Sequence, residues 1–121
     1  MRIELVREYR FEAAHRLTRL PQTHKCWRLH GHSFRFELTL EGEVDPHTGF
    51  LLDFADVDAV AQPVVEKLDH YFLNEVEGLE NPTSEVLSAW IWDRIKPRLP
   101  QLQAVTVSET GDARCIYRGP R

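Results

Sequence analysis

Three histidines and one cysteine near the start of the chain have the residue types and the spacing of a metal-dependent site. His30 and His32 are two residues apart in the stretch CWRLHGH, Cys26 lies four residues before His30, and His15 lies further upstream. Alternate side chains of a strand share one face, so His30 and His32 would point the same way, and a hairpin would bring His15 beside them. Three imidazoles with one open position are typical of a catalytic zinc site.

The role of Cys26 is open on spacing alone. As a fourth ligand it would close the metal site, which is typical of structural zinc. As a nucleophile or a base it would need to ionise readily, and a nearby metal ion or the flanking Lys25 and Arg28 would favour that. It would otherwise be an inert, small apolar side chain.

Two further sets of ionisable residues are candidates for chemistry. Asp69 and His70 are adjacent, so the carboxylate could orient the imidazole as an acid and base, although a histidine at a helix C-terminus is the simpler explanation. Glu109 shares the parity of Val105 and Val107 in a predicted strand, which would place its carboxylate on an apolar face. Such a group is costly unless it is paired or binds a ligand, for example a flat heterocycle with adjacent N–H and amino groups. A solvated strand end would explain it as well.

The strands that must position these residues follow from the hydrophobic pattern. Apolar and polar residues alternate over 3–11 and 33–41, which predicts two half-buried strands. Two further strands are predicted over 103–110 and 115–117. The histidines would then lie where the first strand ends and the second begins.

Two helices are predicted between the second and third strands. Apolar residues at helical spacing predict the first over 54–69, with Asp53 as its N-cap and a distortion at Pro63. The second begins at Asn81, which can cap and precedes a proline, and ends before Pro97. This order of elements favours an α+β fold, in which both helices cover one face of a four-stranded, mostly antiparallel sheet. The other, more polar face would be solvated or covered by another subunit.

The composition is that of a single domain over residues 1–121, with 42% apolar residues and a formal net charge of −4. Charges of both signs are interspersed, so we expect no basic surface of the kind that binds nucleic acid. No apolar run approaches the roughly 20 residues that cross a bilayer, and the first residues lack the pattern of a signal peptide. We therefore expect no membrane partner and a cytoplasmic location, where Cys26 and Cys115 remain reduced.

Five short motifs occur in order along nearly the whole chain. They are FEAAHRL at 11–17, CxxxHGH at 26–32, LDHxxLN at 68–74, NPTSE at 81–85 and ET at 109–110. Together they resemble the 6-pyruvoyltetrahydropterin synthase superfamily. Within it, the full-length similarity, including LENPTSEVL at 79–87, favours the bacterial 6-carboxytetrahydropterin synthases, which make the pterin precursor of 7-deazapurines such as queuosine.

The resemblance implies the tunnelling fold (T-fold), in which antiparallel sheets from several subunits join into a barrel. It also implies a homo-oligomer built from trimers, commonly paired into hexamers, with active sites between subunits. That assembly would cover the polar face of the sheet. The positions that match the family's zinc ligands are His15, His30 and His32.

The resemblance also implies roles for the remaining candidates. Cys26 matches a proton-transfer residue rather than a ligand, and Asp69 and His70 match the other catalytic pair. Glu109 matches the residue that anchors the pterin ring. The further positions expected near the pterin are Thr83, Ser84 and Glu85.

The family's substrate is dihydroneopterin triphosphate, and the resemblance implies that zinc assists proton removal from its side chain as a Lewis acid. Triphosphate leaves, and the carboxy branch also releases acetaldehyde, whereas the sister pyruvoyl synthase keeps the side-chain carbons. Arg16, Lys25 and Arg28 are equal candidates for contacting the triphosphate. Trp27 stands where a smaller residue would leave more room, and it could wall the pocket. The alternative from another class is a zinc-stabilised binding module without chemistry, with Cys26 as a fourth ligand.

Overall fold

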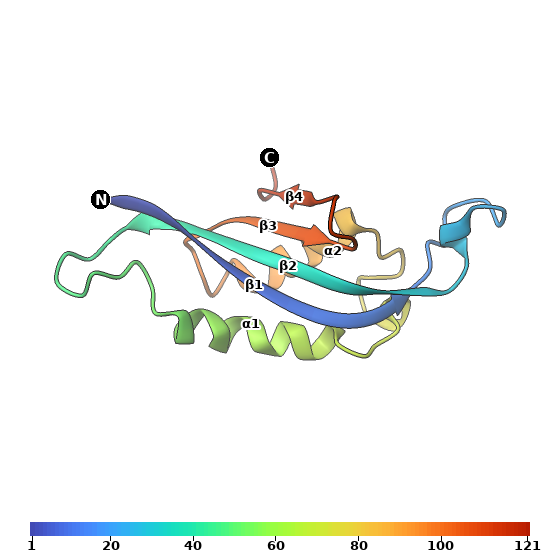
Figure 1. Cartoon of the computed structure of the whole chain (residues 1–121), viewed down its shortest axis with the longest axis horizontal. Helices are drawn as coiled ribbons and strands as arrows, with labels where there is room; N and C mark the ends of the chain where they lie inside the picture. The colour runs from blue at the N-terminus through green and yellow to red at the C-terminus, as the bar shows by residue number, and fades with distance from the viewer.

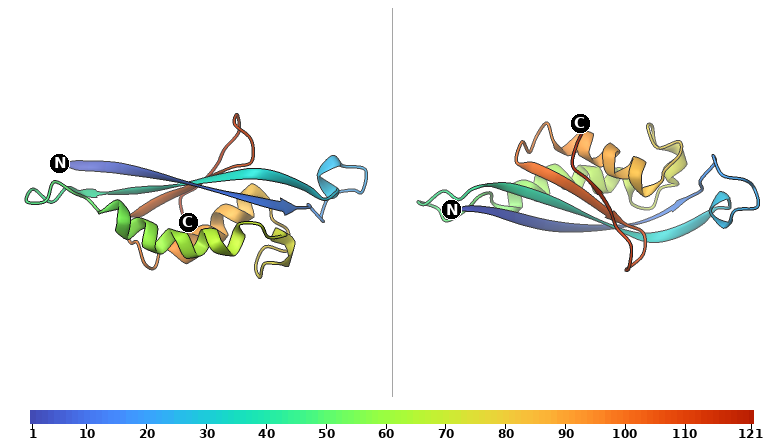
Figure 2. Two further views of the ribbon diagram at one scale, coloured as in Figure 1. Left: turned by 60° about the horizontal axis from the view of Figure 1, so that its bottom comes forward. Right: turned by 90° about the horizontal axis from the view of Figure 1, so that it is seen from above.

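The computed structural model describes residues 1–121 and contains one four-stranded antiparallel sheet with two helices on one of its faces (Figure 1). Figure 2 shows both helices on the same side of the sheet. The predicted α+β arrangement is therefore confirmed. The strands, which lie side by side in chain order, are β1 (Arg2–His15), β2 (His30–Glu43), β3 (Leu102–Ser108) and β4 (Cys115–Tyr117), and the helices are α1 (Phe54–Leu68) and α2 (Ser84–Ile95).

β1 and β2 form a long ribbon whose register runs from Arg2 opposite Glu43 to His15 opposite His30. Both strands extend beyond the predicted ranges 3–11 and 33–41. At the end of the ribbon that carries the histidines, small residues interrupt the alternation of apolar and polar side chains, whereas the backbone pairing continues through them. The extension places all three histidines inside regular strands.

Alternate residues of the two long strands face the helices and form the core. Phe11 stacks on Phe34 with ring centroids 5.0 Å apart, and Tyr9 stacks on Phe36 at 5.3 Å. The core cluster contains 23 buried residues from the sheet, both helices and the connections between them. Each large apolar side chain buried in this way contributes about 1.5–3 kcal/mol, so the fold has a substantial core of its own.

The helices begin and end close to the predicted positions, and the structure corrects two features of the helices and one of a strand. The Asp53 side chain caps α1 by accepting from the Ala55 amide at 2.9 Å, as expected. α1 continues through Pro63 to Leu68, so the proline removes one backbone donor without interrupting the helix. The cap of α2 is Thr83 and not Asn81, because the Thr83 hydroxyl accepts from the Val86 amide at 3.1 Å. β3 also ends at Ser108, two residues earlier than predicted.

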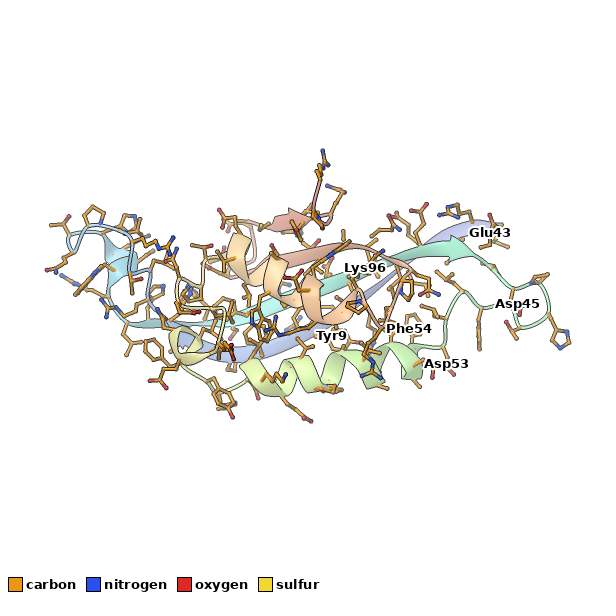
Figure 3. All side chains as sticks on the ribbon, turned by 180° about the vertical axis from the view of Figure 1, so that it is seen from behind. Tyr9, Glu43, Asp45, Asp53, Phe54 and Lys96 are labelled. Atoms are coloured by element: carbon orange, nitrogen blue, oxygen red, sulfur yellow. The ribbon has the colours of Figure 1, made fainter.

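An ion pair with an added hydroxyl ties α1 to the first strand. The Arg7 guanidinium donates two hydrogen bonds of 3.0 Å to the Asp58 carboxylate, and the Tyr9 hydroxyl donates to the same carboxylate. The Arg7 guanidinium also lies 5.9 Å from the centre of the Phe54 ring. Figure 3 shows Tyr9 between the sheet and α1, with Phe54 at the start of that helix. Neither helix has the length and apolar character of a transmembrane span.

Candidate active site

The three histidines converge at the end of the β1–β2 ribbon. His15 and His30 are direct cross-strand partners, and His32 lies two residues further along β2 on the same face. The ring centroids are 4.6 Å apart for His15 and His30, 5.2 Å for His15 and His32, and 5.0 Å for His30 and His32. One ring nitrogen from each lies within 4.8 Å of the others, so the three could bind a single metal ion.

Backbone carbonyls orient two of these rings. The Nδ1 atom of His15 lies 2.9 Å from the Pro82 carbonyl oxygen, and Nδ1 of His30 lies 2.7 Å from that of Arg28. A carbonyl only accepts, so both Nδ1 atoms carry the hydrogen and both Nε2 atoms keep a free lone pair. Such a second partner is what fixes a metal-ligating histidine.

His15 provides the observation that tests the fit of a metal. It is fully buried, and its Nε2 atom is buried without a hydrogen-bond partner. A buried polar atom without a partner is costly, and a cation at the centre of the three rings would satisfy it. Burial lowers the pKa of His15, so the ring is neutral, which is the form that binds metals. The residues present therefore fit a metal ion.

Glu109 lies beside this cluster, with its Oε2 atom 3.6 Å from Nε2 of His32. The Ser84 hydroxyl donates to Oε1 of Glu109 at 3.0 Å. Glu109 follows the last residue of β3 and its side chain is 28% exposed, so the carboxylate is half-buried and paired, between the two alternatives of a buried group and a solvated strand end. Glu109, Ser84 and Glu85 line a cavity of about 340 Å³, whereas Thr83 is used as the helix cap.

Asp69 and His70 lie along the outer edge of β1 rather than against the imidazole cluster. The Glu12 amide donates to Asp69 Oδ1 at 2.8 Å, and the Glu12 carbonyl accepts from the His70 amide. The Asp69 carboxylate lies 2.9 Å from Nδ1 of His70, as the acid–base hypothesis expects. The Glu12 amide, and then His70, hold the pKa of Asp69 below its usual range. His70 and His32 contribute to the wall of one open cavity of about 580 Å³.

His70 is the one residue other than glycine with a positive φ, at 64°. This conformation is unfavourable for a side chain with a Cβ and is most often kept at functional positions. Contacts on either side hold it, because the His70 amide donates to Glu12 and the Ala14 amide donates to the Tyr71 carbonyl. His70 in this conformation lines the cavity beside β1.

Cys26 lies in the loop between β1 and β2, in a single 3-10 turn from Lys25 to Trp27. Its sulfur makes no hydrogen bond in the structure, and the metal-binding cluster contains no cysteine. This arrangement favours an open three-histidine site over a closed four-ligand site. Lys25 and Arg28 are exposed, whereas the Arg16 guanidinium is engaged with Trp27, so the two exposed cations remain the better candidates for a phosphate.

Sequence reasoning missed two groups that position the site. The Pro82 carbonyl orients His15, and no sequence signal could have identified it because every residue has a carbonyl. The Asn74 side chain accepts from the Arg16 amide at 2.9 Å and donates to the Arg16 carbonyl at 2.8 Å, directly after His15. Asn74 is half-buried, and the only sequence signal for its role is its place in the LDHxxLN motif.

Comparison with known proteins identifies the family. A family model described as 6-pyruvoyl tetrahydropterin synthase matches residues 4–120. The chain belongs to this family. A 6-carboxy-5,6,7,8-tetrahydropterin synthase from Synechocystis sp. is 40% identical, over 97% of this chain and 94% of that protein. A dihydroneopterin monophosphate aldolase from Pyrococcus furiosus is 35% identical, over 83% of this chain and 81% of that protein.

The solved structures agree with this assignment. The structure of Caenorhabditis elegans 6-pyruvoyl tetrahydropterin synthase superposes with a TM-score of 0.92 at 29% identity, over 99% of this chain and 97% of that one. The expected tunnelling-fold subunit is thereby confirmed. The three relatives are named for different activities, and each name includes a pterin compound. The chain is accordingly an enzyme of the pterin synthase family.

Proposed function

We propose that this protein converts 7,8-dihydroneopterin triphosphate and water into 6-carboxy-5,6,7,8-tetrahydropterin, acetaldehyde and triphosphate, as a step of queuosine (7-deazapurine) biosynthesis. The observation that carries the proposal is the three-histidine cluster, in which the buried Nε2 atom of His15 has no partner and Nε2 of His32 lies 3.6 Å from the Glu109 carboxylate, a group suited to a pterin ring. The choice of product is supported by the 40% identity to the 6-carboxy synthase of Synechocystis sp.. Residues 1–121 would act as one domain.

In this proposal His15, His30 and His32 hold Zn²⁺, and for His15 and His30 the ligating nitrogen is the Nε2 atom that the backbone carbonyls leave free. Zinc bound there would supply Lewis-acid polarisation of the side-chain hydroxyl groups of the substrate. Three imidazoles suit zinc among the divalent ions, and three protein ligands leave a position open for substrate.

Glu109 is proposed to fix the pterin ring. Its carboxylate would accept hydrogen bonds from an adjacent N–H and amino group, an arrangement that matches two oxygens of one carboxylate. The Ser84 hydroxyl, 3.0 Å from Oε1, holds the carboxylate in place, and Glu85 lies in the same cavity. Thr83 supports these residues by capping α2.

Cys26 and His70 are proposed to move protons on the carbon side chain, with Asp69 orienting His70. Asp69 remains ionised because its pKa is lowered, so it can accept from Nδ1 of His70 and leave Nε2 free for the substrate. Within one chain no hydrogen bond joins Cys26 or His70 to the imidazole cluster, although His70 and His32 line one open cavity. We therefore propose a cytoplasmic homo-oligomer built from trimers that pair into hexamers, in which neighbouring chains complete each site.

The test is incubation of the zinc-loaded protein with dihydroneopterin triphosphate, followed by mass analysis of the pterin and an assay for acetaldehyde. The proposal predicts 6-carboxytetrahydropterin and acetaldehyde in equal amounts. A pterin that keeps all three side-chain carbons, with no acetaldehyde, would instead indicate the pyruvoyl activity. That second candidate is favoured by the close superposition with the Caenorhabditis elegans enzyme.

A binding module without chemistry is the remaining alternative. It requires a closed site that includes Cys26, so replacing Cys26 with alanine would release the metal. The enzyme proposal predicts that the same variant keeps about one metal ion per chain and loses turnover, because three histidine ligands suffice. The metal content of Cys26→Ala, measured by inductively coupled plasma mass spectrometry, distinguishes the enzyme from the binding module.

A further inference from the structure

The loop that carries Cys26 extends beyond the last paired residues of the β1–β2 ribbon (Figure 1, light blue). Residues 16–29 contain only one 3-10 turn, from Lys25 to Trp27. Hydrogen bonds within the turn are local: the Trp27 amide donates to the His24 carbonyl, and the His24 ring accepts from the Cys26 amide. These bonds shape the turn but do not fix its position relative to the imidazole cluster.

Two contacts join the two arms of this loop. The Leu17 amide donates to the Cys26 carbonyl at 2.8 Å. Next to it, the Arg16 guanidinium lies over the Trp27 ring, with its central carbon 4.3 Å from the ring centre, and its Nε donates to the Trp27 carbonyl at 3.2 Å. A planar guanidinium on an indole face is a favourable contact, and Arg16 and Trp27 are both half-buried.

Arg16 is itself held at its backbone. The Asn74 side chain bonds to both the amide and the carbonyl of Arg16, and it also donates to the Glu80 carbonyl at 3.3 Å. Because Arg16 directly follows His15, its backbone has a fixed position relative to the imidazole cluster. A continuous set of contacts therefore runs from Asn74 through Arg16 to Trp27, the neighbour of Cys26.

We propose that Arg16 and Trp27 are positioning residues that hold the Cys26 loop against the end of the ribbon and so set the place of the thiol relative to the three histidines. The inference rests on the proposed function for its catalytic consequence. A reacting group displaced by about 1 Å loses on the order of 100-fold in rate, so a contact that restricts this loop affects the chemical step more than substrate binding.

The test compares five forms of the zinc-loaded protein: wild type, Trp27→Ala, Trp27→Phe, Arg16→Ala and Arg19→Ala. Phenylalanine keeps a ring for the guanidinium. Arg19 is an exposed arginine of the same loop whose side chain makes no hydrogen bond, ion pair or ring contact, so it serves as the matched control. Iodoacetamide labelling is followed by peptide mass spectrometry, which reports Cys26 and Cys115 separately. Cys115, which lies in β4, is the internal control.

We expect Cys26 labelling to accelerate about fivefold or more in Trp27→Ala and at least as much in Arg16→Ala, because removing the contact exposes a half-buried thiol. Trp27→Phe and Arg19→Ala should remain within twofold of wild type, and Cys115 should label equally in all forms. In turnover, kcat should fall about tenfold in Trp27→Ala while KM and the metal content stay unchanged.

Three results would overturn the inference. Cys26 could label in Trp27→Ala at the wild-type rate, Trp27→Phe could accelerate labelling as much as Trp27→Ala, or Trp27→Ala could lose its metal. The last would mean that the contact acts on the histidines instead of the thiol. If the wild type itself does not turn over dihydroneopterin triphosphate, the proposed function fails. The labelling rates then still decide whether Arg16 and Trp27 position Cys26.

Discussion

At the scale of single residues, the chemistry of the site depends on which nitrogen of each histidine is free. Carbonyls of Pro82 and Arg28 occupy Nδ1 of His15 and His30, which leaves Nε2 available. Sequence spacing was sufficient to predict that His15, His30 and His32 meet. It could not predict the carbonyls, because their identity depends on how the segment before α2 packs against the ribbon.

The first prediction concerns His30. Replacing it with alanine should lower zinc affinity at least ~100-fold, because only two of the three ligands remain. Even the loss of a residue that hydrogen-bonds to a metal ligand lowers metal affinity about 10- to 100-fold. His47 lies exposed in a turn, outside the cluster, so His47→Ala is the matched control and should bind zinc like wild type. Competition with a zinc-binding dye measures both affinities. Equal affinities would contradict the assignment of the ligands.

At the scale of elements, the sequence predicted the order and type of the four strands and the two α-helices, whereas it did not predict the short 3-10 helices Lys25–Trp27 and Leu73–Glu75, and most of its other errors lie at the ends of elements. Alternation failed near His15 and His30 because small residues there carry no pattern, although the backbone continues to pair. The cap of α2 was misplaced because Asn81 and Thr83 are both suitable side chains, and only the geometry selects Thr83. The positive φ of His70 had no sequence signal at all.

The second prediction concerns the contact between β1 and α1. Asp58→Asn should lower the free energy of unfolding by about 1 kcal/mol at pH 7, because it removes a partly exposed charged partner of Arg7 and Tyr9. Hydrogen bonds from Arg7 and then Tyr9 lower the pKa of Asp58 below its ordinary 3.8. The stabilisation is therefore present above pH 3.8 and is lost as the pH falls through the lower folded-state value.

Urea unfolding of wild type and Asp58→Asn at pH values from about 2.5 to about 7 measures this difference. This pH range spans the ordinary pKa values of carboxyl groups. Glu66→Gln is the control, because Glu66 is an exposed carboxylate of the same helix without a recorded ion pair. It should change stability by less than about 0.5 kcal/mol at any of these pH values. A stability difference for Asp58→Asn that persists unchanged at the lowest pH would contradict the role given to the charge.

At the scale of the whole molecule, the parts proposed for catalysis are separated within one chain. The imidazole cluster is at the end of the ribbon, Asp69 and His70 lie outside the edge of β1, and the Cys26 loop extends beyond both strands. The open sheet face also carries exposed apolar side chains, with Val6 54% and Ile116 50% exposed. Both features fit the proposed assembly, in which chains complete one another's sites.

The third prediction tests that assembly. Cys26→Ala and His70→Ala should each be inactive, but co-expressed chains should regain activity if Cys26 and His70 of one site belong to different chains. Random mixing in equal amounts then leaves about a quarter of the sites intact in a cyclic oligomer. Wild-type chains co-expressed with each variant provide the reference. No recovery in oligomers shown to be mixed would mean that both residues serve a site within one chain.

Because the three histidines lie at one end of the β1–β2 ribbon, a bound ion would make the two ends differ in how easily the strands separate. At the opposite end, the Val44 amide donates to the Met1 carbonyl, and the Met1 amino group and the Arg2 side chain contact the second strand through exposed ion pairs with Glu43 and Glu41. Exposed pairs contribute little, so backbone amides there should exchange hydrogen soonest. A bound ion would slow amide hydrogen exchange at the histidine end alone. After its removal, the two strands would separate locally from both ends.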